Sequence, residues 1–505
     1  MQDKLDQLKA LLHPAHDLTM AAALLQWDQE TYMPPGGVEA RADQLATLSQ
    51  MAHELFTADE VGQLLEELAP YEADLDYDSD EASLIRVTRR EYERERRVPA
   101  ELVAEIARAA SQAQVAWVKA RQASDFATFR PCLEKNVELT VRRAGCFDVP
   151  PSGHIYDPLL DLYEPDMTSA GVREVFEALR PALVELTAQI AERQDAVDDS
   201  VLRQPYDEAA QWDFSLVLAR GLGYDFERGR QDKSPHPFTT SFSIDDVRIT
   251  SRIDPANPAV CWFGTVHESG HALYEQGVSK ALARSPLAVT ASLGVHESQS
   301  RLYENNLGRG RPFWEFYYPQ AQERFPAQLG GVSLDAFYKA VNKSEPSLIR
   351  TEADEVTYGL HIILRFELEQ AMVTGDARIA DLPDLWNARM QEYLGLTPPD
   401  DAQGVLQDIH WALAAIGYFP TYLLGSVLAV QIYEQAKAEL PGLEVGFARG
   451  DFAPLHDWLR EKVHAHGGKF TLPELAERVT GGPLSIEPYV NYLRAKYGEV
   501  YGLQQ

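Results

Sequence analysis

The chain has 505 residues, of which 45% are hydrophobic and 24% are charged, as is typical of a globular protein with a sizeable core. Its formal net charge of −31 argues against nucleic acid and anionic membranes as partners, because both require a cationic surface. Three scattered cysteines, Cys132, Cys146 and Cys261, are too few for a disulfide framework or a thiolate metal site. With no recognisable signal peptide in the first residues, we expect a cytoplasmic protein.

The N-terminal part of the sequence has helical periodicity almost throughout. We expect a pair of helices first, and the predicted helices are 3–12, 17–30, 38–56, 82–122 (restarting at Ala100 after the break at Val98-Pro99) and 126–144. A Pro-rich connection at 146–168 follows them. We predict one domain over 1–505, with the helical region 1–145 as a candidate lid.

Two further helices are predicted at 169–194 and 206–222. After them comes the one stretch of the chain where apolar and polar residues alternate convincingly, as they do in a strand. Over 236–253, Thr, Phe, Ile and Val alternate with polar residues, which indicates one strand pair. We therefore expect a mainly helical fold with one small β-sheet next to the helix that comes after it.

That helix, predicted at 259–277, carries His267, Glu268 and His271 in an apolar context. Histidines four positions apart lie on one face of a helix, so both imidazoles can bind the same metal ion. Glu268 is then placed to act as the general base on a water molecule that the metal holds. Gly270 is costly inside a helix and indicates the close approach of another backbone or a substrate.

A catalytic zinc site needs a third protein ligand. Position 277 is Gly, so the pattern HExxHxxGxxH, with its third histidine, is absent. A second helix predicted at 291–306 carries His296 and Glu297, and we predict Glu297 as the third metal ligand. His296 is then a contact of the metal ligands or of the substrate, and Arg301, one turn further on, is a residue that orients Glu297.

The sequence after residue 340 again has a helical pattern. We expect residues 349–354 to begin a long helix. The most apolar tract, 411–430, is about as long as a membrane span. Because Pro420, Tyr418 and Tyr422 interrupt it, we predict a buried helix and no membrane partner.

Several short motifs occur in a fixed order along the chain. They are WDQETYMPP at 27–35, HPF at 236–238, DxRxT at 246–250, HExxH at 267–271, HESQ at 296–299, IRxxAD at 349–354 and GxxQDxHW at 404–411. Together they resemble the motif set of the thermostable-carboxypeptidase family of metallocarboxypeptidases, and no motif position departs from it.

The resemblance implies a mainly helical, gluzincin-like fold with a deep cleft, similar in outline to neurolysin and angiotensin-converting enzyme. It also implies the broad-specificity removal of single residues from the free C terminus of peptides. One divalent metal, zinc most simply and cobalt as the alternative, and a homodimer belong to the same expectation.

A carboxypeptidase must bind the free α-carboxylate of its substrate, and arginine does so with two parallel hydrogen bonds. Arg350 and Arg248 are the candidates, and the alternative for each is an ion pair, with Asp354 or Asp246 respectively. His236 and His296, in matched motifs, are predicted as further substrate contacts.

The tetrahedral oxyanion that forms during peptide hydrolysis needs a hydrogen-bond donor besides the metal. His410 is the favoured donor. Tyr418 and Tyr422, which follow it in the apolar tract, are the alternatives.

Two other functions compete with this interpretation. One is an oligopeptidase or dipeptidyl carboxypeptidase with the same metal site, and the products of a digested peptide would distinguish it. The other is a helical binding protein with a structural metal, but such a site usually has four protein ligands, and only three good ones are evident here.

Overall fold

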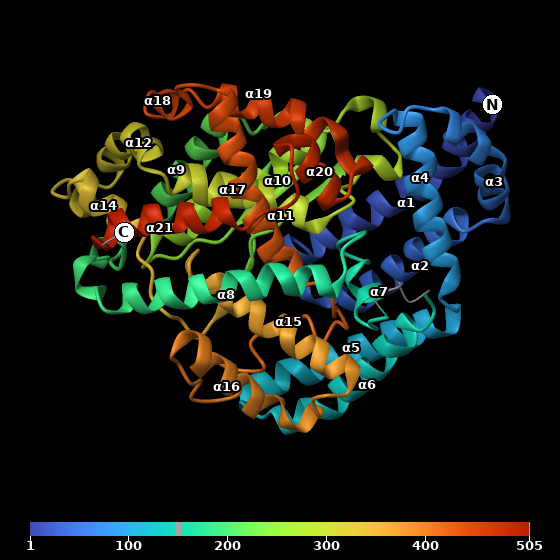
Figure 1. The fold of residues 1–505 in the computed structure, drawn as a ribbon, viewed down its shortest axis with the longest axis horizontal. Coiled ribbons are helices and arrows are strands. Elements are labelled where there is room, and N and C mark those ends of the chain that lie inside the picture. Colours follow the sequence, from blue (N-terminus) through green and yellow to red (C-terminus); the bar gives the residue numbers. More distant parts are fainter. Residues whose placement is uncertain (148–152, 504–505) are drawn as a thin grey trace. The chain divides into compact units, whose positions relative to one another are not determined.

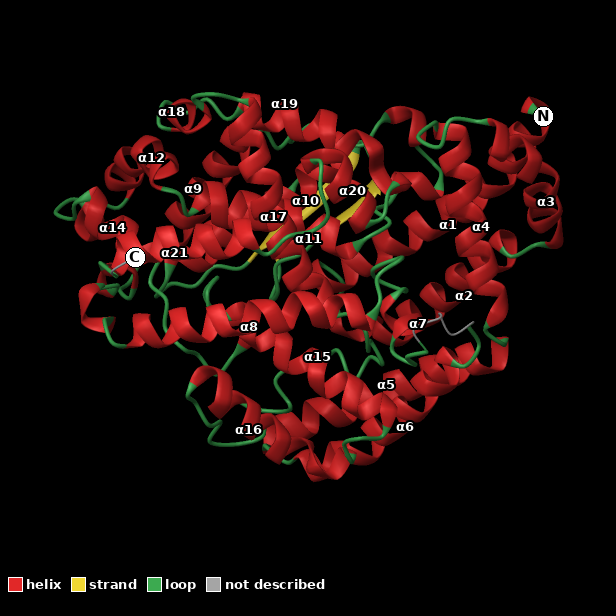
Figure 2. Ribbon diagram, viewed as in Figure 1, coloured by secondary structure: helices red, strands yellow, loops and turns green. Residues whose placement is uncertain are grey.

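The computed structural model describes residues 1–147 and 153–503. The Pro-rich connection predicted at 146–168 lies partly outside these residues. The chain forms two compact units: the first comprises residues 1–96, 199–341 and 432–481, and the second comprises residues 97–198, 342–431 and 482–505. Helices dominate the chain (Figure 1), and within the described residues strands occur in one small sheet (Figure 2), which confirms the predicted fold class.

The helices of the first unit cover its three stretches of sequence. They are α1 (Gln2–Thr31), α2 (Val38–Phe56), α3 (Asp59–Asp74), α4 (Asp80–Arg97), α9 (Glu208–Leu222), α10 (Pro258–Gly277), α11 (Leu293–Arg301), α12 (Arg311–Arg324), α13 (Pro326–Leu329), α14 (Leu334–Val341), α18 (Leu443–Phe447), α19 (Ala453–Lys462) and α20 (Leu472–Thr480). A π-helical segment, Leu302–Gly308, continues α11 directly.

The prediction of two short helices at the N terminus is wrong, because α1 is continuous and contains Pro14. Leu5, Leu8, Leu12 and Ala15 are all buried at helical spacing, so one apolar stripe runs past the proline. Packing of that stripe outweighs the local cost of the proline, and the break expected before residue 17 does not form.

The sheet consists of β1 (Gln231–Lys233), β2 (Thr239–Ser243) and β3 (Asp246–Ser251), in the order β1-β3-β2. The predicted strand pair over 236–253 is confirmed as β2 and β3, which are antiparallel. The parallel strand β1 was not predicted, because three residues are too few to show alternation.

Helix α10 lies in the core of the first unit, and its predicted extent, 259–277, is confirmed. Asn257 caps its N terminus by accepting a hydrogen bond from the Ala259 amide, and Pro258 occupies its first turn. Trp262 is fully buried and packs edge-on against Phe214, with ring centroids 5.1 Å apart. This apolar anchor fixes the helix on which the three motif residues stand.

The second unit has helices and loops but no strand among its described residues. Its helices are α5 (Ala100–Ala123), α6 (Phe126–Ala144), α7 (Asp157–Leu160), α8 (Ser169–Ala191), α15 (Tyr358–Thr374), α16 (Leu382–Leu394) and α21 (Glu487–Tyr501), and the chain leaves this unit along α17 (Pro420–Glu439). The restart at Ala100 is confirmed, but the long helix expected from 349 begins only at Tyr358.

The prediction of a helix through 411–430 is also only partly right, because α17 begins at Pro420 and the residues before it form turns. No helix among the described residues is long and apolar enough to cross a membrane.

Candidate active site

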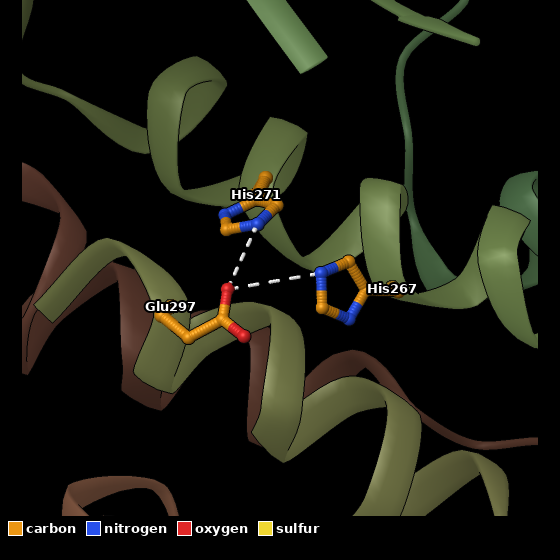
Figure 3. Close-up of side chains that lie close together, drawn as sticks. All are labelled: His267, His271 and Glu297. Atoms are coloured by element: carbon orange, nitrogen blue, oxygen red, sulfur yellow. Dashed lines mark ion pairs between the residues drawn. The ribbon is translucent and has the colours of Figure 1, made fainter. Parts of the chain in front are cut away.

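Three side chains from two neighbouring helices of the first unit converge on one point (Figure 3). His267 and His271 come from α10, and Glu297 comes from α11. The approach of these helices depends on Gly270, where a Cβ atom would lie 2.7 Å from the carbonyl oxygen of Gln299. The close approach that the sequence indicated at this glycine is thereby confirmed, and it brings Glu297 to the two histidines.

The spacing of the three donor atoms suits a metal ion. Oε2 of Glu297 lies 3.4 Å from Nε2 of His271 and 3.8 Å from Nε2 of His267. Two ligand atoms, each about 2.1 Å from a tetrahedral zinc ion, lie about 3.4 Å apart. The arrangement therefore fits a divalent metal in size as well as in donor type.

His267 is oriented by a carboxylate behind it. Its Nδ1 lies 2.9 Å from Oε2 of Glu304, which leaves Nε2 directed toward Glu297. Glu304 is itself held by Arg309 at 3.1 Å. Burial lowers the pKa of His267, but the charges of Glu297 and Glu304 outweigh it and raise the pKa above its ordinary value.

His271 is oriented through a second histidine. Its Nδ1 lies 2.5 Å from Nδ1 of His296, and Nε2 of His296 lies 2.8 Å from Oε1 of Glu275. Burial and the neighbouring His296 lower the pKa of His271 to about 3, so its ring is neutral at pH 7. A neutral imidazole with Nδ1 engaged has Nε2 available as a metal donor.

Glu297 is buried and charged. Burial alone would raise its pKa, but Arg301 and the two histidines hold the pKa well below its usual range. Nε of Arg301 lies 2.6 Å from Oε1 of Glu297, so the orienting contact predicted for Arg301 is present. Oε2, the other carboxylate oxygen, is the one that faces the histidines.

Glu268 lies beside the three donors on α10 and is buried. Burial raises its pKa, against the opposite effects of His267 and of a hydrogen bond from Thr239. A carboxylate with a raised pKa accepts a proton more readily, which suits a general base. Among the described residues, His267, His271 and Glu297 are the single group of three or more His, Cys, Asp or Glu donors that converge closely enough for a metal.

Arg248 and Asp246 form the ion pair that was the alternative for this arginine. Nε and one terminal nitrogen of Arg248 each lie 2.9 Å from the Asp246 carboxylate. The Arg248 guanidinium also stacks 4.4 Å from the Trp27 ring, where it ties the sheet to α1. His236, before β2, is exposed.

The second unit contains a buried cluster of two arginines and one aspartate. Asp408 accepts from Nε of Arg350 at 3.0 Å and from Nε of Arg365 at 2.7 Å. The prediction of Asp354 as the alternative partner of Arg350 is wrong. Asp354 instead accepts from the amides of Val356 and Thr357, just before α15.

His410 lies in the turn segment of the second unit, beside both candidate tyrosines. Its Nε2 is 3.2 Å from the Tyr422 hydroxyl, and its ring centroid is 5.3 Å from that of Tyr418. Burial lowers the pKa of His410 to about 4, so the ring is neutral at pH 7.

Several residues around these sites were not predicted. Glu304 lies seven positions after Glu297 and Glu275 lies four after His271, which are helical spacings that were available in the sequence. No helical spacing in the sequence points to Thr239 or Arg365, because the partners of these residues, Glu268 and Asp408, are distant in the sequence and are brought close only by the fold.

A helical fold with a small sheet beside an HExxH helix, and a glutamate from the next helix, is typical of gluzincin metallopeptidases. The model of the carboxypeptidase Taq (M32) metallopeptidase family matches residues 7–497. Thermostable carboxypeptidase 1 of Thermus thermophilus is 44% identical over 494 residues, with 96% of both chains covered. Carboxypeptidase 1 of Bacillus subtilis is 39% identical over 496 residues, covering 98% of this chain and 97% of the relative.

Solved structures agree with this assignment. The crystal structure of the M32 carboxypeptidase from Deinococcus radiodurans matches with a TM-score of 0.95 at 43% identity, covering 99% of this chain and 100% of that one. The chain belongs to the carboxypeptidase Taq (M32) metallopeptidase family. It is therefore a metallocarboxypeptidase, and this assignment is supported over the oligopeptidase alternative.

Proposed function

We propose that the chain removes single residues from the free C terminus of peptides with broad specificity, and that its metal is zinc bound by His267, His271 and Glu297. Cobalt is the alternative metal. The observation that carries the metal proposal is the convergence of two Nε2 atoms and one charged carboxylate oxygen within 4.8 Å of one another. A bound zinc ion supplies a Lewis acid that polarises the peptide carbonyl and lowers the pKa of water toward 7.

Glu268 acts as the general base in this proposal. Its buried carboxylate takes a proton from the attacking water and delivers the proton to the leaving amine. The raised pKa of Glu268 favours the first step, and its place next to His267 in the chain keeps it beside the proposed metal ligands.

Arg350 binds the α-carboxylate of the substrate. The support is the charge of its cluster: Arg350 and Arg365 carry two positive charges, and Asp408 is the one carboxylate that pairs with either of them among the described residues. A buried excess of positive charge is costly until an anion neutralises it. Arg248 is the weaker candidate, because Asp246 already neutralises it through two hydrogen bonds.

His410 donates a hydrogen bond to the oxyanion, with Tyr418 and Tyr422 as the alternative donors. A neutral imidazole has one N–H to donate, and the pKa of about 4 keeps His410 neutral at pH 7. His236 remains a proposed substrate contact. Both ring nitrogens of His296 are engaged by His271 and Glu275, which favours a role behind the metal ligand over substrate contact.

A homodimer in the cytoplasm, and one catalytic domain over 1–505 with region 1–145 as a lid, complete the proposal. These parts rest on the sequence and on the resemblance to the family. Light scattering tests the assembly: we expect twice the chain mass of 56.5 kDa, and a particle of one chain mass contradicts the dimer.

A timed digest tests the activity most directly. One unmodified peptide and its C-terminally amidated counterpart are incubated with the protein, with and without a chelator, and read by mass spectrometry. We expect a chelator-sensitive ladder that loses one residue at a time from the free-ended peptide only. Internal fragments or two-residue losses from both peptides would contradict the proposal.

A further inference from the structure

The edge strand β2 presents hydroxyl groups to α10 at alternate positions. Thr239 hydrogen-bonds to Glu268, and Ser241 donates to Oε2 of Glu275 at 3.2 Å. The residue after Ser241, Phe242, faces the other way and lies against Trp27, with ring centroids 6.5 Å apart. Successive side chains of a regular strand point to opposite faces, and Thr239, Thr240 and Ser241 pair regularly with β3, so Thr240 faces away from α10.

The contact between Thr239 and Glu268 is short and specific. Oγ1 of Thr239 lies 2.6 Å from Oε2 of Glu268 and 3.0 Å from the Glu268 carbonyl oxygen. A threonine hydroxyl has one hydrogen to donate, and a charged carboxylate is the stronger acceptor. Among the described residues, Oε2 is the one oxygen of the Glu268 carboxylate that accepts a hydrogen bond.

We infer that Thr239 is a positioning residue that fixes the plane of the Glu268 carboxylate, so that Oε1 is the oxygen presented to the attacking water. This inference rests on the proposed role of Glu268 as the general base. The last torsion of a glutamate side chain has broad minima, so the helix alone does not determine the orientation of its two oxygens. A hydrogen bond to one oxygen from a side chain fixed on a strand determines it.

Thr239 is suited to this role because its own side chain has little freedom. A β-branched residue on a strand has a restricted χ1 torsion, and the backbone of Thr239 is paired with Ile249 of β3. Within the described residues, its hydroxyl bonds to Glu268 and to none of the three proposed metal ligands. Loss of the hydroxyl is therefore expected to change turnover and to leave metal binding intact.

The test compares four variants of the full-length, metal-loaded protein. In Thr239→Val, which keeps the shape and removes the hydroxyl, we expect kcat to fall about 10- to 100-fold, the range associated with a hydrogen bond to a charged group. KM and the metal dissociation constant are expected to stay within about twofold, because ground-state and metal contacts are unchanged. Thr239→Ser keeps the hydroxyl and should restore kcat to within about threefold of the wild-type value.

Thr240→Val is the matched control. It makes the same chemical change one position along the same strand, on the face away from α10, and we expect wild-type kcat. Thr239→Ala provides a second variant without the hydroxyl and should reproduce the loss seen in Thr239→Val.

Three results would overturn the inference: wild-type kcat in Thr239→Val, an equal loss in Thr239→Ser, or an equal loss in Thr240→Val. The failure of the proposed function has a different signature. If the Glu268→Gln variant is active, Glu268 is not the general base, and the proposed function fails. If the Glu268→Gln variant is inactive but Thr239→Val is fully active, only the role of Thr239 is overturned.

Discussion

The Nδ1 atoms of His271 and His296 lie 2.5 Å apart, and the two rings are stacked with centroids 4.4 Å apart. A hydrogen bond at this position requires one Nδ1 to donate and the other to accept, so the pair restricts the tautomers of both rings. With Glu275 accepting from the far nitrogen of His296, the favoured arrangement is Nδ1–H on His271 and a free Nε2. His296 and Glu275 therefore favour the His271 tautomer whose Nε2 can serve as the proposed metal donor.

Loss of this support should weaken metal binding. We expect His296→Phe, which retains ring packing without the nitrogens, to raise the metal dissociation constant about 10- to 100-fold, as is usual for groups behind a metal ligand. Competition against a chelating dye measures it. Tyr274→Phe is the control, because Tyr274 packs on His296 and donates its hydroxyl to Gly467 instead. Equal affinities of His296→Phe and wild type would refute the role of the pair.

Gly270 should tolerate no side chain. A Cβ atom there would lie 2.7 Å from the Gln299 carbonyl oxygen and from Cα of Ser300, both backbone atoms that cannot rotate away. We expect Gly270→Ala to lower the free energy of unfolding by about 1–3 kcal/mol and to weaken metal binding by displacing Glu297.

Gly264 provides the control for that substitution, because it lies on the same helix and its added Cβ atom would make an ordinary 3.7 Å contact with Pro237. Gly264→Ala should be neutral or stabilising by about 0.5–1 kcal/mol, since alanine favours helices. Urea denaturation of both variants measures the difference, and similar destabilisation by the two substitutions would contradict the account of Gly270.

Arg350 should matter only for substrates with a free C terminus. We expect Arg350→Ala to reduce kcat/KM on such peptides by the equivalent of about 2–5 kcal/mol, the cost of leaving a buried charge unpaired. On amidated peptides, which are already poor substrates, the change should be small. Asp408 keeps Arg365 as a partner in this variant, so the cluster is expected to remain folded. Equal losses on both substrates would refute the assignment.

His361 should make stability fall in mild acid. It is fully buried in the second unit, and burial together with the charge of Arg365 places its pKa well below the ordinary value. Below about pH 6.5 the unfolded chain takes up a proton that the folded chain does not, so stability is retained above that pH and lost below it. Each such histidine contributes roughly 1.4 kcal/mol per pH unit.

Replacement of this histidine isolates its contribution. Urea denaturation of wild type and His361→Leu at pH 7.5 and 5.5 should show a smaller loss in the variant. Parallel losses in the two proteins would show that His361 does not resist protonation in the folded state.

The convergence of the three proposed metal ligands was predictable because its information is local. The spacing of His267 and His271 specifies one helical face, and α10 forms at its predicted bounds. The helix predicted at 291–306 forms as α11 and the π-helical segment after it, so Glu297 needed only the packing of two neighbouring helices. Glu304 and Glu275 were also within reach, as each lies at a helical spacing from a predicted ligand.

The buried arginine cluster and the segment before α17 were not predictable, because they depend on contacts between residues distant in the sequence. Asp408 lies 43 positions from Arg365, and no periodicity links them. The helix expected before Pro420 fails for a similar reason. Asn136 donates to the carbonyls of Trp411 and Ala412, and Gly417 has φ of 101°, so side chains of other helices take the hydrogen bonds that a helix would have used.

Glu268 is proposed to transfer protons beside a metal ion that it does not bind. The most direct measurement is the metal content, metal affinity and kcat of Glu268→Gln. We expect one metal ion per chain with wild-type affinity, and a fall in kcat of at least about 10²- to 10⁴-fold, the contribution of a general acid–base group. Turnover near the wild-type rate at full metal occupancy would contradict the account.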